Sequence, residues 1–272
     1  MEDVMSGIED WNGRVAVVTG GASGIGRGVV DAFRGAGATV VIADRDPVAL
    51  ARVREEGFTA IETDVTDAAS VAALADQVIA DHGRVDLVVN NAGVGPKGLV
   101  RELTLDDWRW VLEVNLMGVI HGVHHFLPHL RSNPHGAWIV NTASMSRFFT
   151  PPGYAPYVAS KAAVEGLSLS LAAELAADGD QVGVTVLHPG AVRTNIKESL
   201  RNRPAGTAGG LVDFDIAQKI QEDEMWISPA EAGEIVLRAV RAGDRYAFTH
   251  PGMLTDVDTM FDSVRAAMTT YA

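Results

Sequence analysis

The chain has 272 residues, a formal net charge of −13 and no cysteine. The acidic balance argues against nucleic acid as a partner, because phosphate binders usually carry a basic excess. The missing cysteines exclude disulfides, thiolate catalysis, zinc ribbons and iron–sulfur clusters, and no apolar run is long enough to span a membrane. We expect an N-terminal tail over residues 1–12 and a single domain over residues 13–272, in a cytoplasmic protein without membrane contact.

Short apolar runs alternate with Ala-rich amphipathic stretches along the domain. The runs predict strands at Val15–Thr19, Thr39–Ala43, Ala60–Thr63, Leu87–Asn90, Ala137–Asn141, Val182–Leu187 and Tyr246–Thr249. The amphipathic stretches predict helices at Gly24–Gly35, Pro47–Glu56, Ala68–His82, Leu105–Leu130, Ala155–Ala177, Pro229–Ala242 and Thr255–Thr269.

This alternation predicts an α/β fold, a Rossmann-type doubly wound seven-stranded parallel sheet with helices on both faces. Ligands of such folds bind beyond the C-terminal ends of the strands. The residues that follow each strand are therefore the first candidates for a functional site.

A glycine-rich turn joins the first strand to the first helix. Glycines allow the backbone to approach a pyrophosphate closely, and the helix N-terminus adds free N–H groups. In an isolated loop such glycines often mark only a tight turn, but the position between strand and helix favours a phosphate-binding loop. Its expected cofactor contacts are Gly20, Ser23, Gly24, Ile25 and Gly26.

Asp44 ends the second strand, 18 residues after Gly26. A carboxylate there accepts hydrogen bonds from the adenosine ribose hydroxyls and repels a 2′-phosphate, which favours NAD(H) over NADP(H). Arg45 acts in the opposite direction, because arginine pairs well with a 2′-phosphate. The alternative that Asp44 only caps the following turn stays open.

With further motifs, these residues resemble the short-chain dehydrogenase/reductase (SDR) family in its compact single-domain form. The likeness extends from about residue 13 to residue 249. The motifs are TGxxxGxG at residues 19–26, Asp64-Val65, NNAG at residues 90–93, a helix Asn at Asn115, Ser144, YxxxK from Tyr157 to Lys161, and PGxVxT at residues 189–194.

The resemblance implies Asn115, Ser144, Tyr157 and Lys161 as catalytic residues. Tyr157 and Lys161 are four residues apart on a predicted helix and so share a face, where the ammonium is expected to lower the phenol pKa. Tyr157 then acts as general acid and base, and Ser144 holds the substrate oxygen. Further cofactor contacts are implied at Asp64, Val65, Asn91, Ala92, Gly93, Tyr157, Lys161, Pro189, Gly190, Val192 and Thr194.

Substrate contacts are expected at Ser144, Met145, Tyr154 and Tyr157. Phe148, Phe149 and Tyr154 are either an aromatic wall over an apolar substrate or packing within their loop. Residues 195–226 follow the PGxVxT motif, where relatives place a substrate lid, although a surface insertion is the alternative. The chain departs from the family at Arg147, where relatives usually carry glycine three residues after the catalytic serine.

The function of two predicted helix faces can be interpreted in more than one way. His121, His124, His125 and His129 lie on one predicted helix, but their spacing lacks a metal-site motif, and we predict no metal. Ala162, Ala163, Leu167 and Leu171 form a small apolar face. By resemblance this face builds a homodimer or homotetramer interface, and burial within one subunit is the alternative.

The sequence therefore predicts an NAD(H)-dependent oxidoreductase that interconverts a secondary alcohol and a ketone or aldehyde on an apolar, medium-sized substrate. Three alternatives stay open. They are an NADP(H)-dependent ketone reductase, a different reaction on the same fold, and an NAD(H)-binding sensor or scaffold without turnover. Substrate identity, reaction direction and oligomer size are not encoded in readable motifs.

Overall fold

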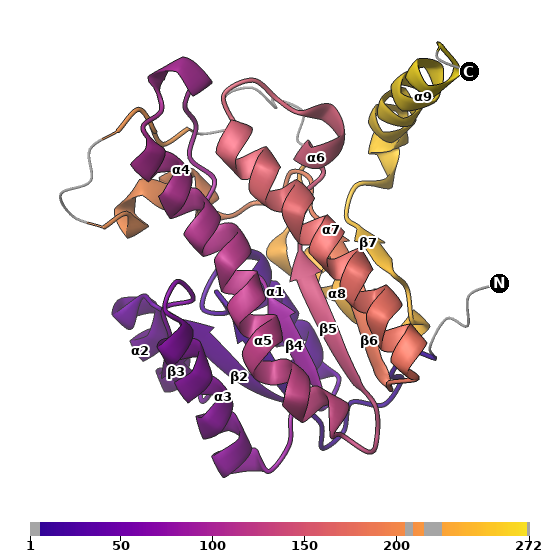
Figure 1. The fold of residues 1–272 in the computed structure, drawn as a ribbon. Coiled ribbons are helices and arrows are strands. Elements are labelled where there is room, and N and C mark those ends of the chain that lie inside the picture. The colour runs from indigo at the N-terminus through magenta and orange to yellow at the C-terminus, as the bar shows by residue number, and fades with distance from the viewer. Residues whose placement is uncertain (1–5, 205–208, 215–224, 271–272) are drawn as a thin grey trace.

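The fold is built on a seven-stranded parallel sheet (Figure 1). The computed structural model describes residues 6–204, 209–214 and 225–270. The strand order is β3-β2-β1-β4-β5-β6-β7, and every neighbouring pair is parallel, as predicted. The strands are β1 Val15–Thr19, β2 Thr39–Asp44, β3 Thr59–Glu62, β4 Leu87–Asn90, β5 Ala137–Thr142, β6 Val182–His188 and β7 Tyr246–Phe248.

Helices cover both faces of this sheet. The α-helices are α1 Gly24–Gly35, α2 Pro47–Glu55, α3 Ala68–His82, α4 Leu105–Leu112, α5 Gly118–Arg131, α6 Ser146–Phe149, α7 Ala155–Asp178, α8 Pro229–Ala242 and α9 Leu254–Thr270. Short 3₁₀ segments are η1 Val100–Glu102, η3 Asn195–Asn202 and η6 Pro251–Met253. No helix within the described residues is long and apolar enough to cross a membrane.

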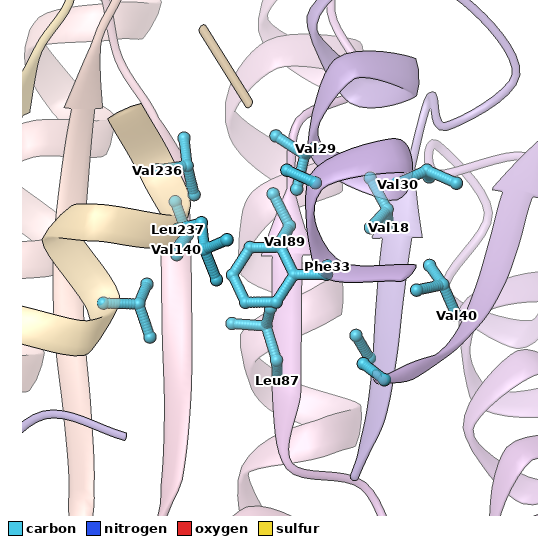
Figure 2. Close-up of a cluster of buried hydrophobic side chains, with 14 of the residues drawn as sticks. Val18, Val29, Val30, Phe33, Val40, Leu87, Val89, Val140, Val236 and Leu237 are labelled. Carbon is cyan, nitrogen blue, oxygen red and sulfur yellow. The ribbon is translucent and has the colours of Figure 1, made fainter. Parts of the chain in front are cut away.

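The central strands β1, β4, β5 and β6 are buried along their whole length, because their apolar residues face helices on both sides. Figure 2 shows the cluster under α1 and α8, where the Phe33 ring lies among valine and leucine side chains of the sheet and α8. The two helices approach to backbone contact at Gly28, where a Cβ atom would lie 1.7 Å from the carbonyl oxygen of Pro229.

The chain changes direction across the sheet between β1 and β4, which are neighbours. The connections from β1 lead outward to β2 and β3, whereas those from β4 lead outward to β5, β6 and β7. Crossovers on opposite sides leave a crevice beyond the C-terminal ends of the strands at this point. The sheet topology thus fixes where a ligand site can form.

The helix predicted over Leu105–Leu130 is present as one continuous helical run, in which α4 passes without a break into a π-helical turn η2 at Glu113–Met117 and then into α5. The π turn itself was not predicted. A π turn inserts an extra residue into the helical repeat, and such turns are frequent at functional sites. Here the π turn contains Asn115, which is fully buried.

The two ends of the described chain differ in how they pack against the sheet and its helices. Within the segment predicted as an N-terminal tail, Ile8 and Trp11 are buried in the core under α1 and α8. The Ile8 N–H donates to the carbonyl of Val240 at 3.2 Å, and the Trp11 ring meets Phe33 edge-on at 4.7 Å. At the other end α9 stands away from the sheet and buries none of its residues (Figure 1).

Candidate active site

A cavity of about 900 Å³ lies beyond the C-terminal ends of the strands. All the residues predicted to contact cofactor or substrate line it, with the exception of Gly26. Of the four predicted catalytic residues, Ser144, Tyr157 and Lys161 line the cavity, and Asn115 lies behind its wall. The motifs are therefore brought together at one place by the fold.

The glycine-rich turn has the backbone that its sequence predicted. Gly20 and Gly24 have φ of +63° and +54°, in the left-handed region that favours glycine. A Cβ on Gly26 would lie 2.3 Å from the carbonyl oxygen of Gly20, so this glycine is needed for close packing of helix and turn. The Ser23 side chain makes no capping hydrogen bond to α1 within the described residues. The first-turn N–H groups of α1 thus form a cradle that suits an anion.

Asp44 and Arg45 lie where the adenosine end of a dinucleotide is expected. The Asp44 carboxylate accepts hydrogen bonds from the N–H groups of Ala22 at 3.2 Å and of Asp46 at 3.1 Å. It thus caps its own turn, yet a carboxylate has lone pairs left for a ribose. The Arg45 guanidinium lies 3.6 Å from the carboxylate of Asp64, which partly neutralises its charge.

Three polar side chains meet at the inner end of the cavity. Ser144, just after β5, accepts a hydrogen bond on its Oγ from the Ser146 N–H at 3.1 Å, and its hydroxyl hydrogen-bonds the Tyr157 phenol. Lys161 lies one helical turn further along α7, with its Nζ 5.8 Å from the centre of the Tyr157 ring. This ammonium donates to the carbonyl of Thr142 at 2.7 Å, which fixes it beside the end of β5.

Asn115 connects the π turn to this group. Its Oδ1 accepts from the Val94 N–H at 2.8 Å, and its Nδ2 donates to the Val94 carbonyl at 2.9 Å and to Ser160 Oγ at 3.1 Å. A Cβ on Gly93 would lie 3.3 Å from Asn115 Oδ1 and 3.6 Å from Lys161 Nζ. Asn115 and Lys161 therefore flank Gly93, and the asparagine amide itself clamps the backbone at Val94.

Burial dominates the ionisation of the two titratable groups at the site. It raises the pKa of the Tyr157 phenol, while the hydrogen bond to Ser144 lowers that pKa to a smaller extent. It lowers the pKa of Lys161 to about 8. The sequence-based expectation of a lowered Tyr157 pKa is wrong for this structure, because burial of the phenol disfavours the phenolate and the hydrogen bond to Ser144 offsets only part of that effect.

This geometry can be compared with known proteins. A family model described as "short chain dehydrogenase" matches residues 14–205. The chain belongs to the short-chain dehydrogenase family. It is accordingly an oxidoreductase.

Relatives of this dehydrogenase include proteins with named substrates. It is 36% identical over 257 residues, covering 92% of this chain and 89% of the relative, to a 1-deoxy-11-beta-hydroxypentalenate dehydrogenase of Streptomyces avermitilis. It is 34% identical over 196 residues, covering 70% of this chain and 75% of the relative, to a 3beta-hydroxysteroid dehydrogenase 2 of Eggerthella lenta. A crystal structure of a short chain dehydrogenase/reductase from Burkholderia phymatum in complex with NAD matches with a TM-score of 0.86 at 34% identity, over 96% and 97% of the two chains.

Arg147, the departure from the family motif, is not part of the cavity wall of this dehydrogenase. Its guanidinium forms an ion pair with the buried carboxylate of Glu165 on α7. The same guanidinium lies 4.9 Å from the centre of the Phe148 ring and reaches Met260 Sδ of α9 at 2.9 Å. Arg147 thus joins α6 to α7 and α9 behind the cavity.

The predicted aromatic wall is divided by the structure. Phe149 and Tyr154 line the cavity, whereas Phe148 is buried against His188 and Phe248, with ring centres 5.2 and 6.0 Å apart. Met253 also lines the cavity and was not predicted. Its position shortly after β7 was the available signal, because the ends of parallel strands converge on the site.

The described part of the predicted lid lies over the cavity. It supplies Ile196, Phe214 and Trp226 to the cavity wall, and residues 205–208 and 215–224 lie outside the described residues. Several contacts anchor it to the body, among them a pair of backbone hydrogen bonds between Lys97 and Val212. Ser199 Oγ accepts from the Gly95 N–H at 2.9 Å, and Arg203 pairs with the buried carboxylate of Asp107 on α4 at 2.7 Å.

The structure also shows what the histidine face of α5 and the small apolar face of α7 contact. On α5, His121 Nδ1 donates to the carbonyl of Val65 at 2.9 Å and so supports a residue of the cavity wall. On α7, Leu171 is buried in the core of the subunit, whereas Ala162 is exposed. The face proposed for subunit contact is therefore partly used within the subunit itself.

Proposed function

We propose that this chain is an NAD(H)-dependent dehydrogenase that interconverts a secondary alcohol and a ketone or aldehyde. The observation that carries the proposal is the convergence of Ser144, Tyr157 and Lys161 on a cavity that the glycine-rich turn also lines. The relatives named for hydroxylated polycyclic compounds support an apolar, medium-sized substrate. The cavity wall contributed by Phe149, Met145 and Trp226 has the same apolar character.

The residues present fit a dinucleotide. The cradle at Gly20 and Gly24 suits its pyrophosphate, and Asp44 suits an unphosphorylated adenosine ribose. The nicotinamide of the bound cofactor supplies or accepts the hydride. An NADP(H)-dependent ketone reductase is the second candidate, and Arg45 is the residue that favours it.

In the oxidation direction, Tyr157 takes the proton of the substrate hydroxyl on its phenolate oxygen. Ser144 donates a hydrogen bond to the substrate oxygen, which orients it toward Tyr157. The ammonium of Lys161, 5.8 Å from the centre of the Tyr157 ring, favours the phenolate electrostatically during the proton transfer. Asn115 holds the backbone at Val94 and so maintains the wall beside Lys161.

Replacing the proposed acid and base tests this mechanism. Tyr157→Phe is expected to lower kcat by about 10²–10⁴-fold, since only the proton-transferring hydroxyl is removed. Tyr154→Phe is the matched control, because its ring also lines the cavity, 6.4 Å from that of Tyr157. We expect the control to change KM more than kcat. Wild-type turnover of Tyr157→Phe on a substrate accepted by the parent enzyme would refute the mechanism.

Cofactor choice is tested separately by fluorescence titration with NADH and NADPH, which uses the five tryptophans as donors. We expect NADH to bind more tightly, and Asp44→Ala to bring the two affinities closer together by removing the carboxylate that repels a 2′-phosphate. Asp46→Ala, which alters the neighbouring helix cap, is the control. A parent enzyme that prefers NADPH would favour the second candidate.

The proposed homodimer or homotetramer and the cytoplasmic location stay predictions. Binding of NADH without turnover on a broad panel of alcohols and ketones would revive the alternative of a sensor or scaffold.

A further inference from the structure

The C-terminal helix α9 carries an apolar stripe that its own subunit leaves largely uncovered. Leu254, Val257, Phe261, Val264 and Met268 follow one another at alternating steps of three and four residues. Of these, Leu254 is 62% exposed and Met268 73% exposed, Phe261 and Val264 are also exposed, and Val257 is partly buried. Figure 1 shows the helix projecting from the body beyond β7.

The spacing of this stripe specifies the kind of partner. Alternating steps of three and four residues make the narrow seam by which one helix packs against another, in contrast to the broader apolar face of a helix that covers a globular core. A membrane surface fits poorly, because the polar side of α9 carries Asp256, Asp258 and Asp262, whereas membrane-surface helices are rich in lysine and arginine.

The charged residues beside the apolar stripe of α9 favour the α9 helix of a second copy of this chain as the partner. In an antiparallel pair, Phe261 packs against Val264 of the second copy, and Val257 packs against Met268 of the second copy. This register places Asp258 next to Arg265 of the second copy, and twofold symmetry repeats the pair. A parallel pair would instead place Arg265 beside Met260 of the second copy and form no opposite-charge contact.

The contacts within the subunit leave this pairing available. Asp258 and Arg265 are two turns, about 10 Å, apart on α9 and cannot pair within one helix. Arg265 does contact Asp262 at 2.8 Å, but both side chains are about 70% exposed, at 74% and 70%, and such pairs are weak. The contact of α9 with its own subunit lies on the side of the stripe away from Asp258 and Arg265, where Met260 contacts Arg147.

We propose that α9 is a homodimerisation helix, which pairs antiparallel with α9 of a second copy of this chain through the seam of Leu254, Val257, Phe261, Val264 and Met268. The proposal does not depend on the reaction that the enzyme catalyses.

Site-directed cross-linking tests the register directly, because the chain has no cysteine of its own. Asp258→Cys and Arg265→Cys chains are co-expressed in the full-length enzyme and treated with a short bis-maleimide. We expect a covalent dimer from this mixture. Thr259→Cys co-expressed with Arg265→Cys is the matched control and is expected to give little product, since Thr259 lies outside the seam. Equal yields from the two mixtures, or no product from either, would overturn the proposal even if the enzyme assembles through other surfaces.

Charge reversal provides an independent readout without cross-linker. Arg265→Asp turns both opposite-charge contacts into like-charge contacts, and we expect it to raise the concentration at which the α9-mediated assembly dissociates by about tenfold. The double variant Asp258→Arg with Arg265→Asp exchanges the charges and is expected to restore assembly, as measured by light scattering at low salt. A double variant that dissociates like the single one would contradict the antiparallel pairing.

Discussion

Lys161 shows how burial at a functional site alters stability. Its side chain is almost completely buried, and its pKa falls to about 8, against about 10.4 for an unfolded lysine. Between these two values the unfolded chain binds more protons than the folded chain, so the free energy of unfolding rises with pH. Below pH 8 the charged lysine lowers stability by a constant amount.

Lys161→Met removes this titration. We expect the difference in unfolding free energy, parent minus variant, to increase by about 2 kcal/mol between pH 7.5 and 10, as integration of the linkage relation gives. Urea unfolding of both proteins at several pH values measures it. A difference that stays flat over this range would mean that the ammonium is better solvated than its burial indicates.

Sequence reasoning located the residues whose position depends on their neighbours in the chain. The left-handed glycines, the Ser144–Tyr157 spacing and the shared face of Tyr157 and Lys161 are local patterns, and the structure brings them to one cavity. The role of Arg147 could not be predicted, because its partner Glu165 is 18 residues away on another helix. Nothing in the spacing of the two residues shows that they meet.

At the scale of elements, the Arg147–Glu165 ion pair holds α6 against α7. Removal of one partner leaves a buried charge uncompensated, and we expect Arg147→Ala to cost about 3 kcal/mol. Replacing both by apolar residues, as in Arg147→Met with Glu165→Leu, is expected to recover most of the loss. Arg109→Ala is the control, because Arg109 and Asp106 form an ion pair that is largely exposed.

Thermal unfolding measures the four proteins together. For a domain of this size the loss in Arg147→Ala corresponds to a fall in Tm of roughly 6–12 °C, whereas the control should change Tm by no more than about 2 °C. If Arg147→Ala is as stable as the control variant, the pair contributes no more than a surface contact.

The π turn inside the helix predicted at residues 105–130 coincides with a tertiary contact. The apolar periodicity of this segment is helical throughout, so the pattern alone predicts one element. The π turn at Glu113–Met117 coincides with the clamp that Asn115 forms on Val94, a contact with the loop after β4. Propensity and periodicity describe a helix, but they do not contain the long-range hydrogen bonds that can reshape one of its turns.

At the scale of the whole molecule, the alternation of strands and helices was sufficient to predict the sheet. Buried parallel strands need apolar runs, and right-handed crossovers leave few topologies. The placement of the chain ends was not predictable in the same way. Ile8 and Trp11 are too few to form a periodic pattern, yet they complete the core under α1 and α8. The outward position of α9 likewise could not be predicted, because its periodicity indicates an amphipathic helix but not where that helix packs.

The thermal stability of the folded domain can show which cofactor it binds, because a ligand that binds only the folded state raises Tm. A ligand that binds only the folded state stabilises it by about 2.7 kcal/mol at a concentration of 100 Kd. For a domain of this size we expect NADH at that concentration to raise Tm by roughly 5–10 °C. NADPH at equal concentration is the control and should raise Tm less, because Asp44 faces the cavity and Arg45 lies against Asp64. Equal shifts would show that Asp44 does not discriminate, and no shift with either would show that the cavity is not a dinucleotide site.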